Sequence, residues 1–309
     1  MNIVIYGTGG VGGYFGARLA QAGNNVTFIA RGKHLETIQQ KGLQLKSIKG
    51  NYLVYPANAT SNILEVQDID LILIGVKTWQ LNEVAQKIQP VLKENTMVIS
   101  LLNGVDNAGI LCKSLDKRNV LGGLCKVVSK VEDYGVINHV SYEPTIVFGE
   151  LNNEKTKRAL NLEQTFLNAG ITTKLTSNIQ KEIWSKFLFI TTISAIGALT
   201  RATIGEMIAS EEIRKIMHQT ALEILAIAKA KNINLPDSII EKQFQVIESQ
   251  PYNTTASLQR DILEGKPSEL EAQNGTIVKM GKELGIPTPV NAFIYNCLLP
   301  QEKKARGLS

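Results

Sequence analysis

The sequence predicts a doubly wound α/β domain followed by a domain built of helices alone. In the first half of the 309-residue chain, short apolar β-type segments alternate with segments of helical periodicity, the pattern of βαβ units around a mostly parallel sheet. After Asn178 the β-type alternation ends and long helical patterns follow. The chain is 44% hydrophobic and 20% charged, which is typical of a globular protein of about two domains at this length. We therefore expect domains at residues 1–177 and 178–309.

The elements of the first domain follow one another in βα order. Strands are predicted at Asn2–Tyr6, Asn25–Ala30, Leu71–Val76 and Met97–Leu102, with weaker strand patterns at Asn119–Cys125, Thr145–Phe148 and Gly170–Thr176. Helices are predicted at Val11–Ala22, which Gly23 ends, and at Leu81–Leu92. The run Leu71–Val76 is apolar throughout, as expected of a strand that is covered on both faces.

The second domain begins with a helix that is apolar nearly all round, Ile183–Thr200, and such a helix is expected to be buried. A stretch of about 20 apolar residues also fits a membrane span. Lys186 and several Ser and Thr residues interrupt it, however, and no second stretch of this kind follows, so we do not expect a membrane protein. Further helices are predicted at Ile208–Asn232, Ser238–Ser249 and Ser268–Leu284, and a frayed polar tail at Gln301–Ser309.

Charge and cysteine usage exclude several classes of protein. The 33 Lys and Arg residues exceed the 28 Asp and Glu residues by five, but they are scattered, which argues against a nucleic-acid partner. The three cysteines and three histidines are far apart, so neither a disulfide framework nor a metal site is indicated. The chain enters its first strand pattern without a signal segment, and we expect a cytoplasmic protein.

A glycine-rich motif connects the first predicted strand to the first predicted helix. Gly7-Thr8-Gly9-Gly10-Val11-Gly12 matches G-x-G-x-x-G in the context that gives this motif its meaning. The first glycine permits the tight turn, the second lets the backbone approach a pyrophosphate, and the third lets helix and strand pack closely. The N–H groups at the helix start would hold the phosphates. We interpret the first domain as a Rossmann-type dinucleotide-binding domain; the alternative is a glycine-rich turn without a ligand.

The end of the second strand indicates which dinucleotide binds. An NAD enzyme usually offers Asp or Glu to the ribose hydroxyls there, whereas this chain has Ala30-Arg31-Gly32-Lys33. Arg31 can form two charge-assisted hydrogen bonds to a 2′-phosphate, which an acid would repel. The sequence therefore favours NADP(H). The alternative is that Arg31 and Lys33 are solvated loop charges.

Two more polar residues follow buried strands directly. Lys77 comes after Leu71–Val76 and Asn103 after Met97–Leu102, at the strand edge where ligands bind in open α/β sheets. Lys77 can contact a cofactor phosphate or ribose, and the Asn103 amide can orient substrate or nicotinamide. Each can also be an ordinary polar loop residue.

Lys186 is the only ionisable residue between Glu182 and Arg201. A buried ammonium is costly unless it has a partner or a task. A ketone that accepts hydride develops negative charge on oxygen, which a positioned lysine can stabilise and protonate. Burial would also lower the pKa of such a lysine and ease proton transfer. The alternative is that its long stem carries the charge out to water.

The segment Pro267–Gly275 admits a purely structural explanation. Ser268 followed by Glu271 three residues later matches a capping box, and Glu269 can complement the helix dipole.

Taken in order, these motifs resemble the ketopantoate reductase family, the 2-dehydropantoate 2-reductases, over essentially the whole chain. They are the N-terminal G-x-G-x-x-G, Val76–Trp79, Asn103–Gly104, Gly135–His139, Trp184–Lys186, Ser257 and Glu269–Gly275. The resemblance implies an NADPH-binding Rossmann domain joined to a helical domain, with substrate in the cleft between them. It implies that Lys186 is the catalytic lysine and that Ser257 contacts substrate. It also implies that Gly7 to Gly12, Asn103 and Glu269 contact the cofactor.

The chain departs from the family pattern in the predicted substrate pocket. Pantoate-forming members tend to carry asparagines four and eight residues after the lysine, on one helix face, where this chain has Ile190 and Ser194. Ser194 keeps a hydroxyl and is expected, with Asn103 and Ser257, to bind substrate. Ile190 cannot form such a hydrogen bond and makes the pocket more apolar.

We therefore expect an NADPH-dependent enzyme that reduces a small 2-oxo acid, ketopantoate first, to the 2-hydroxy acid in pantothenate biosynthesis. One alternative is a related dehydrogenase for a more apolar 2-oxo acid. Another is a non-catalytic NADP(H)-binding sensor. A homodimer formed through the helical domain is compatible with the sequence, which does not fix the oligomeric state.

Overall fold

The computed structural model describes residues 1–308 and divides the chain into two compact units. One consists of Met1–Leu102 and Asp106–Ile179, and the other of Asn103–Val105 and Gln180–Ser309. The first contains a mostly parallel sheet with helices, and the second is helical. The predicted fold class is therefore confirmed.

The first unit is built on a ten-stranded sheet. Six neighbouring strands are parallel and stand in the order β5 (Asn58–Thr60), β2 (Asn25–Ile29), β1 (Asn2–Tyr6), β6 (Leu71–Ile74), β7 (Met97–Ser100) and β8 (Val120–Asp133). This is the strand order of a doubly wound dinucleotide-binding sheet, in which ligands bind at the carboxyl ends of the strands. The turn after β1 lies at that edge, as do the residues after β6 and β7.

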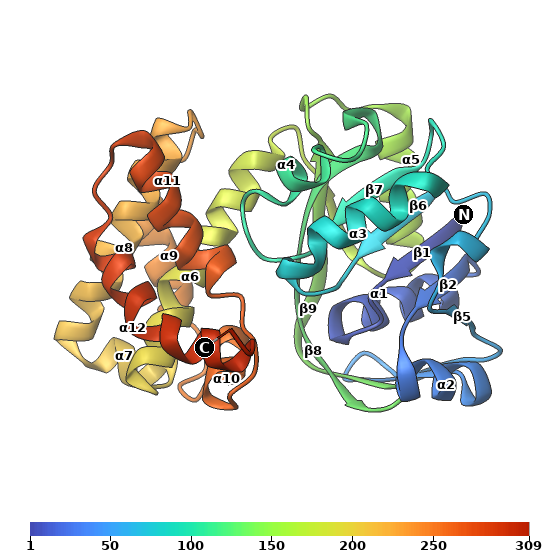
Figure 1. Cartoon of the computed structure of the whole chain (residues 1–309), viewed down its shortest axis with the longest axis horizontal. Coiled ribbons are helices and arrows are strands. Elements are labelled where there is room, and N and C mark those ends of the chain that lie inside the picture. Colours follow the sequence, from blue (N-terminus) through green and yellow to red (C-terminus); the bar gives the residue numbers. More distant parts are fainter. Residues whose placement is uncertain (309) are drawn as a thin grey trace. The chain divides into compact units, whose positions relative to one another are not determined.

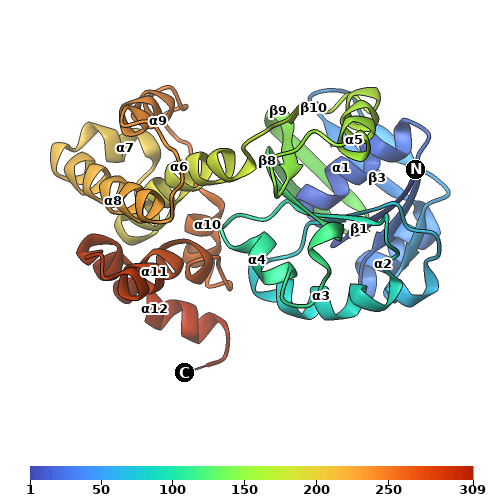
Figure 2. The same ribbon diagram turned by 90° about the horizontal axis from the view of Figure 1, so that it is seen from above.

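Alternate side chains of the central strand belong to opposite faces of the sheet, as a two-residue period requires. Ile3 and Ile5 share a core cluster with α1 (Gly10–Gln21) and α5 (Lys157–Asn168), whereas Val4 and Tyr6 belong to the cluster of α3 (Leu81–Ile88) and α4 (Asn107–Leu111). Figure 2 shows α1 and α5 on one side of the sheet and α3 and α4 on the other. Both faces are therefore covered, which explains why β6 is apolar throughout.

Two of the three weak strand patterns, those at Asn119–Cys125 and Thr145–Phe148, prove to be parts of one long antiparallel ribbon. Strand β8 runs to Asp133 and pairs with β9 (Val136–Glu150), with register shifts along the way. Figure 1 shows the two strands running alongside each other over most of their length. The shifts interrupt the two-residue alternation on which strand prediction depends, so only the regular ends were recognised. The elements of this unit that were not predicted also include α4, α5, α2 (Gly32–Lys41), β3 (Leu43–Ser47), β4 (Tyr52–Val54) and β5. The last strand, β10 (Thr172–Leu175), pairs with β9.

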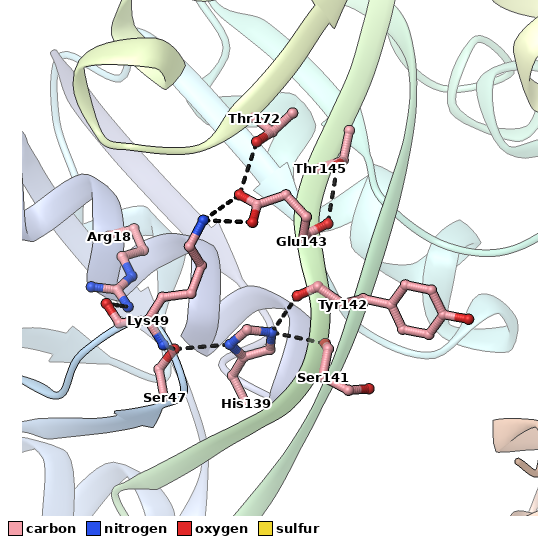
Figure 3. A network of polar contacts seen from close by, with 9 residues as sticks. All are labelled: Arg18, Ser47, Lys49, His139, Ser141, Tyr142, Glu143, Thr145 and Thr172. Carbon is pink, nitrogen blue, oxygen red and sulfur yellow. Dashed lines mark hydrogen bonds and ion pairs between the residues drawn. The ribbon is translucent and has the colours of Figure 1, made fainter. Parts of the chain in front are cut away.

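His139 occupies the irregular part of this ribbon. Its side chain is buried, with Nδ1 2.8 Å from the Ser47 hydroxyl and Nε2 2.9 and 3.0 Å from the carbonyl oxygens of Ser141 and Tyr142 (Figure 3). Carbonyl oxygens only accept, so Nε2 carries the proton and Nδ1 accepts from Ser47. His139 thus satisfies carbonyls where the ladder is irregular, and we assign it a structural role.

The second unit is organised around α6 (Ile179–Thr200), which carries Trp184, Phe187 and Leu188 in the core. The helices that follow are α7 (Ile204–Ala209), α8 (Glu211–Ala230), α9 (Ile239–Glu248), α10 (Ser257–Leu263), α11 (Thr276–Leu284) and α12 (Pro289–Ala305). The predicted single helix Ile208–Asn232 is interrupted at Ser210, whose side chain caps α8. By length and composition α6 could cross a membrane, but 67% of its apolar stretch is buried inside the protein, as in the core helix of a globular protein.

The expected frayed tail is wrong for the described residues up to 308. Helix α12 continues to Ala305, and the side chain of Glu302 is 4% exposed. Glu302 accepts hydrogen bonds from the backbone N and the hydroxyl of Ser268 and pairs with Arg306. The polar composition of this segment suggested a solvated tail, but Glu302 and Arg306 lie four residues apart on one helix face, where they pair with each other.

Candidate functional site

The glycine-rich turn after β1 has the geometry that close approach of a phosphate requires. Gly7 has φ +100°, a left-handed conformation that favours glycine. A Cβ at Gly12 would lie 2.1 Å from the Gly7 carbonyl oxygen, so only glycine fits where α1 begins. A Cβ at Gly9 would meet no atom nearer than 3.9 Å. The turn is therefore tightly built at both ends and open at Gly9.

The other predicted residues of the motif face the protein. The Thr8 hydroxyl donates to the Ile29 carbonyl oxygen at 3.0 Å, and Thr8 is 4% exposed. A Cβ at Gly10 would lie 2.4 Å from the Ser129 carbonyl oxygen, and Val11 packs against the core. Any contact that Thr8 and Gly10 make with a cofactor would therefore be through the backbone.

Arg31 immediately precedes α2, at the end of β2, with its side chain 61% exposed. Its Nη2 lies 3.8 Å from Oε1 of Glu83 on α3. A hydrogen bond from Lys87 lowers the pKa of Glu83, so this carboxylate is charged at neutral pH. Arg31 is therefore accessible to an anion, and the neighbouring Glu83 carboxylate would repel an anion that binds there.

Lys77 follows β6 by three residues and is half-buried. Its Nζ lies 5.9 Å from the centre of the Trp79 ring, on which it forms a cation–π contact. Its backbone N donates to the side chain of Gln80 at 3.2 Å. Trp79 itself is 40% exposed, so the ammonium is held beside an accessible indole.

Lys186, Asn103 and Glu269 form a hydrogen-bonded chain within the second unit. The Lys186 ammonium donates to Oδ1 of Asn103 at 2.8 Å, and Nδ2 of Asn103 donates to Oε2 of Glu269 at 2.9 Å. Asn103 enters this unit because the segment Asn103–Val105, which begins three residues after the end of β7, groups with the helices. An ammonium only donates and a carboxylate only accepts, so the two charged partners fix the orientation of the amide.

The hydrogen bonds from Lys186 to Asn103 and from Asn103 to Glu269 prepare the ammonium for acid catalysis. Glu269 is 7% exposed, while Lys186 and Asn103 are half-buried. In this contact the ammonium meets a neutral amide oxygen, which orients it without taking its proton. A lysine held in this way can stabilise an oxyanion and donate a proton to it. The Asn103 amide thus joins Lys186, 83 positions away in the sequence, to Glu269, 166 positions away.

The segment that carries Glu269 is held from both sides, and the predicted capping box is absent. The Ser268 hydroxyl donates to Glu302, and Glu271 instead accepts from the hydroxyl of Tyr295 at 2.6 Å. Burial and this bond raise the pKa of Tyr295 to about 12. Residues 271–275 form a π-helix, a distortion often found at functional sites. Glu269, two residues before this segment, accepts the hydrogen bond from Asn103.

The three residues predicted to shape the substrate pocket differ in exposure. Ile190 is half-buried one helical turn after Lys186. Ser194 has no exposed surface, and its hydroxyl donates to the Ile190 carbonyl oxygen at 2.6 Å. The structure thus does not place the Ser194 hydroxyl where a ligand can reach it. Ser257 begins α10 and is half-buried.

His34 is a polar residue at the glycine-rich turn that the sequence did not reveal. Its Nε2 lies 2.8 Å from the Thr8 carbonyl oxygen, and its Nδ1 accepts from the backbone N of Gly135 at 3.0 Å. A lone histidine in a polar helix gives no signal of this contact, because both of its partners are backbone groups far away in the sequence.

Comparison with known proteins decides the family. The sequence models of ketopantoate reductase PanE/ApbA match residues 3–153, and those of its C-terminal part match residues 178–302. The chain belongs to the ketopantoate reductase family. It is 32% identical to the 2-dehydropantoate 2-reductase of Archaeoglobus fulgidus, over 96% of each chain. It is 31% identical to the uncharacterised oxidoreductase YkpB of Bacillus subtilis, over 96% of this chain and 97% of that one.

Solved structures agree with this assignment. A crystal structure of a PanE/ApbA family ketopantoate reductase from Ralstonia eutropha is similar, with a TM-score of 0.91 and 30% identity over 99% of this chain and 100% of that one. The predicted family is therefore confirmed, and the chain is an NADP-dependent oxidoreductase of the ketopantoate reductase family.

The turn and the residues around it fit the cofactor of this family. The open position at Gly9 leaves room for a pyrophosphate beside the start of α1, where backbone N–H groups and the helix dipole favour an anion. Arg31, exposed at the end of β2, has the chemistry for a 2′-phosphate.

Proposed function

We propose that this ketopantoate reductase family member reduces a small 2-oxo acid to its 2-hydroxy acid with NADPH, and that ketopantoate, giving pantoate for pantothenate biosynthesis, is the first substrate to consider. The observation that carries the proposal is the chain from Lys186 through Asn103 to Glu269. Relatives named 2-dehydropantoate 2-reductase support the choice of substrate.

In this proposal the residues of the first unit bind the dinucleotide. The turn Gly7–Gly12 receives the pyrophosphate, Arg31 the 2′-phosphate, and Lys77 a phosphate or ribose. Bound NADPH supplies the hydride. Asn103 contacts the nicotinamide end or the substrate through its amide, and Glu269 lies on the cofactor side.

Lys186 acts on the substrate carbonyl. Its ammonium donates a hydrogen bond to the carbonyl oxygen and, as the carbon receives the hydride, transfers a proton to that oxygen to give the hydroxyl. Solvent water then reprotonates the lysine. Asn103 orients the ammonium, Glu269 fixes Asn103, and Ser257 contacts the substrate. Ser194 can contribute only if its hydroxyl leaves Ile190.

A second candidate substrate class is favoured by Ile190. An isoleucine one turn from the catalytic lysine offers apolar surface where a hydrogen-bonding residue would bind a substrate hydroxyl. A 2-oxo acid with an apolar side chain is therefore the rival to ketopantoate, which carries a hydroxyl.

Initial rates of NADPH oxidation separate the two candidates. The purified protein is tested with ketopantoate and with branched and aromatic 2-oxo acids, and kcat/KM is compared. A higher kcat/KM for ketopantoate supports the first candidate, and a higher value for the apolar acids supports the second. Absence of NADPH oxidation with every acid would contradict the proposal.

We also propose that the enzyme works in the cytoplasm and needs neither a nucleic acid nor a membrane as a partner. Assembly as a homodimer through the helical unit belongs to the proposal as well. Sedimentation equilibrium of the purified protein measures the molecular mass, and a monomer mass would contradict the dimer.

A further inference from the structure

His34 connects three segments that are distant in the sequence. It lies in the first turn of α2, its Nε2 is 2.8 Å from the carbonyl oxygen of Thr8, and its Nδ1 is 3.0 Å from the backbone N of Gly135. Thr8 belongs to the glycine-rich turn, and Gly135 to the turn between β8 and β9. One half-buried imidazole thus joins the turn to the tip of the long ribbon.

The two contacts allow only one form of the ring. A backbone N–H can only donate, so Nδ1 must present its lone pair to Gly135, and a carbonyl oxygen can only accept, so Nε2 must carry the proton. The imidazole is therefore neutral, with both nitrogens in use.

The contact with the Thr8 carbonyl bears directly on the phosphate-binding part of the turn. The Thr8 carbonyl and the Gly9 N–H belong to the same planar peptide and point in opposite directions. Whatever fixes that carbonyl also fixes the direction of the Gly9 N–H, at the position that is open to a ligand. The backbone N–H and the side chain of Thr8 are already fixed, because the N–H and the hydroxyl both donate to the Ile29 carbonyl oxygen.

We propose that His34 is a positioning residue for the dinucleotide: by holding the Thr8 carbonyl, it directs the Gly9 N–H toward the pyrophosphate. This inference rests on the proposed binding of NADPH at the turn. His34 is not itself a phosphate ligand in this scheme, because its Nε2–H already donates a hydrogen bond to the Thr8 carbonyl oxygen. Its effect should therefore appear in the binding of ligands that carry a pyrophosphate, and should leave the hydride-transfer step unchanged.

Three ligands separate this role from a general structural one. NADPH and 2′-phospho-ADP-ribose both carry the pyrophosphate, and the second lacks the nicotinamide. Adenosine 2′-monophosphate carries the 2′-phosphate but no pyrophosphate. Dissociation constants are measured by calorimetry for the wild type, His34→Ala and His34→Gln. His218→Ala is the matched control, because it removes a histidine from α8 in the helical unit.

His34→Ala should weaken NADPH and 2′-phospho-ADP-ribose equally, by about tenfold, since one hydrogen bond contributes up to about that factor. Adenosine 2′-monophosphate should bind as to the wild type, and kcat at saturating NADPH should stay the same while KM for NADPH rises. His34→Gln, whose amide can both donate and accept, should recover most of the affinity. His218→Ala should match the wild type with all three ligands.

Several results would overturn the inference. Unchanged NADPH affinity in His34→Ala is one. Equal weakening of adenosine 2′-monophosphate is another, because the substitution would then act by displacing α2 and Arg31. If His34→Ala does not fold, His34→Asn, with a shorter amide, is tested in the same way. A wild type that does not bind NADPH would instead refute the proposed function, so the two failures are distinguishable.

Discussion

Replacing Glu302 with alanine should destabilise the helical unit strongly, although Glu302 lies in a polar C-terminal segment. The Glu302 side chain is 4% exposed and accepts from the N and the hydroxyl of Ser268, which has no exposed surface. It also pairs with the guanidinium of Arg306 at 2.6 Å, which is 19% exposed. The substitution removes the acceptor of two buried donors and the carboxylate that pairs with a largely buried guanidinium. Breaking a buried pair in this way costs about 3–5 kcal/mol.

Thermal unfolding followed by circular dichroism measures this loss. In domains of about 150–250 residues, each kcal/mol of lost stability lowers the melting temperature by roughly 2–4 °C. The melting temperature of Glu302→Ala should therefore fall by about 10 °C. Lys303→Ala is the control, because Lys303 is exposed on the same helical turn, and such surface changes stay within about 0.5 kcal/mol. If both variants melt together with the wild type, the C-terminal segment is frayed after all and the buried network does not form in solution.

Three further predictions concern cofactor, substrate and pH. Glu83→Gln should tighten NADPH relative to NADH by about two- to fivefold at low salt, because it removes a carboxylate beside Arg31; an unchanged ratio of dissociation constants would contradict this. Ile190→Asn should shift kcat/KM toward ketopantoate and away from apolar 2-oxo acids, by about tenfold for one regained hydrogen bond, and a shift the other way would remove Ile190 from the pocket. Although burial opposes its ionisation, hydrogen bonds from Arg158 and Thr156 hold the pKa of Glu150 below its ordinary value. The destabilisation by Glu150→Gln, measured by urea unfolding, should therefore be full at neutral pH and shrink as the pH falls through that lowered pKa; a loss that does not depend on pH would refute the assignment.

Regular elements of the fold were predictable because their patterns are local. The strands Asn2–Tyr6 and Leu71–Ile74 and the helix α1 follow from apolar runs and from glycines at a turn. Strand β9 was largely missed because its register shifts break the alternation. Helix α12 was missed because Pro300 lies inside it and its polar end is buried against Ser268, an arrangement that no local pattern encodes.

The candidate site shows the same division. Lys186 was recognisable because one charge stood alone in an apolar helix, and Asn103 because it directly followed a buried strand. Their hydrogen bond to each other, and that of Asn103 to Glu269, depend on tertiary structure. His34 was missed because its partners are the backbone groups of Thr8 and Gly135, which carry no side-chain signature.

The central claim is that the ammonium of Lys186 donates the proton in a reduction by NADPH. Steady-state turnover and NADPH affinity of Lys186→Ala, measured side by side with the wild type on the best 2-oxo acid, test it most directly. We expect kcat to fall by about 10²- to 10⁴-fold, as for loss of a general acid, while the dissociation constant of NADPH stays within about twofold. A variant that turns over at nearly the rate of the wild type would show that the proton comes from elsewhere.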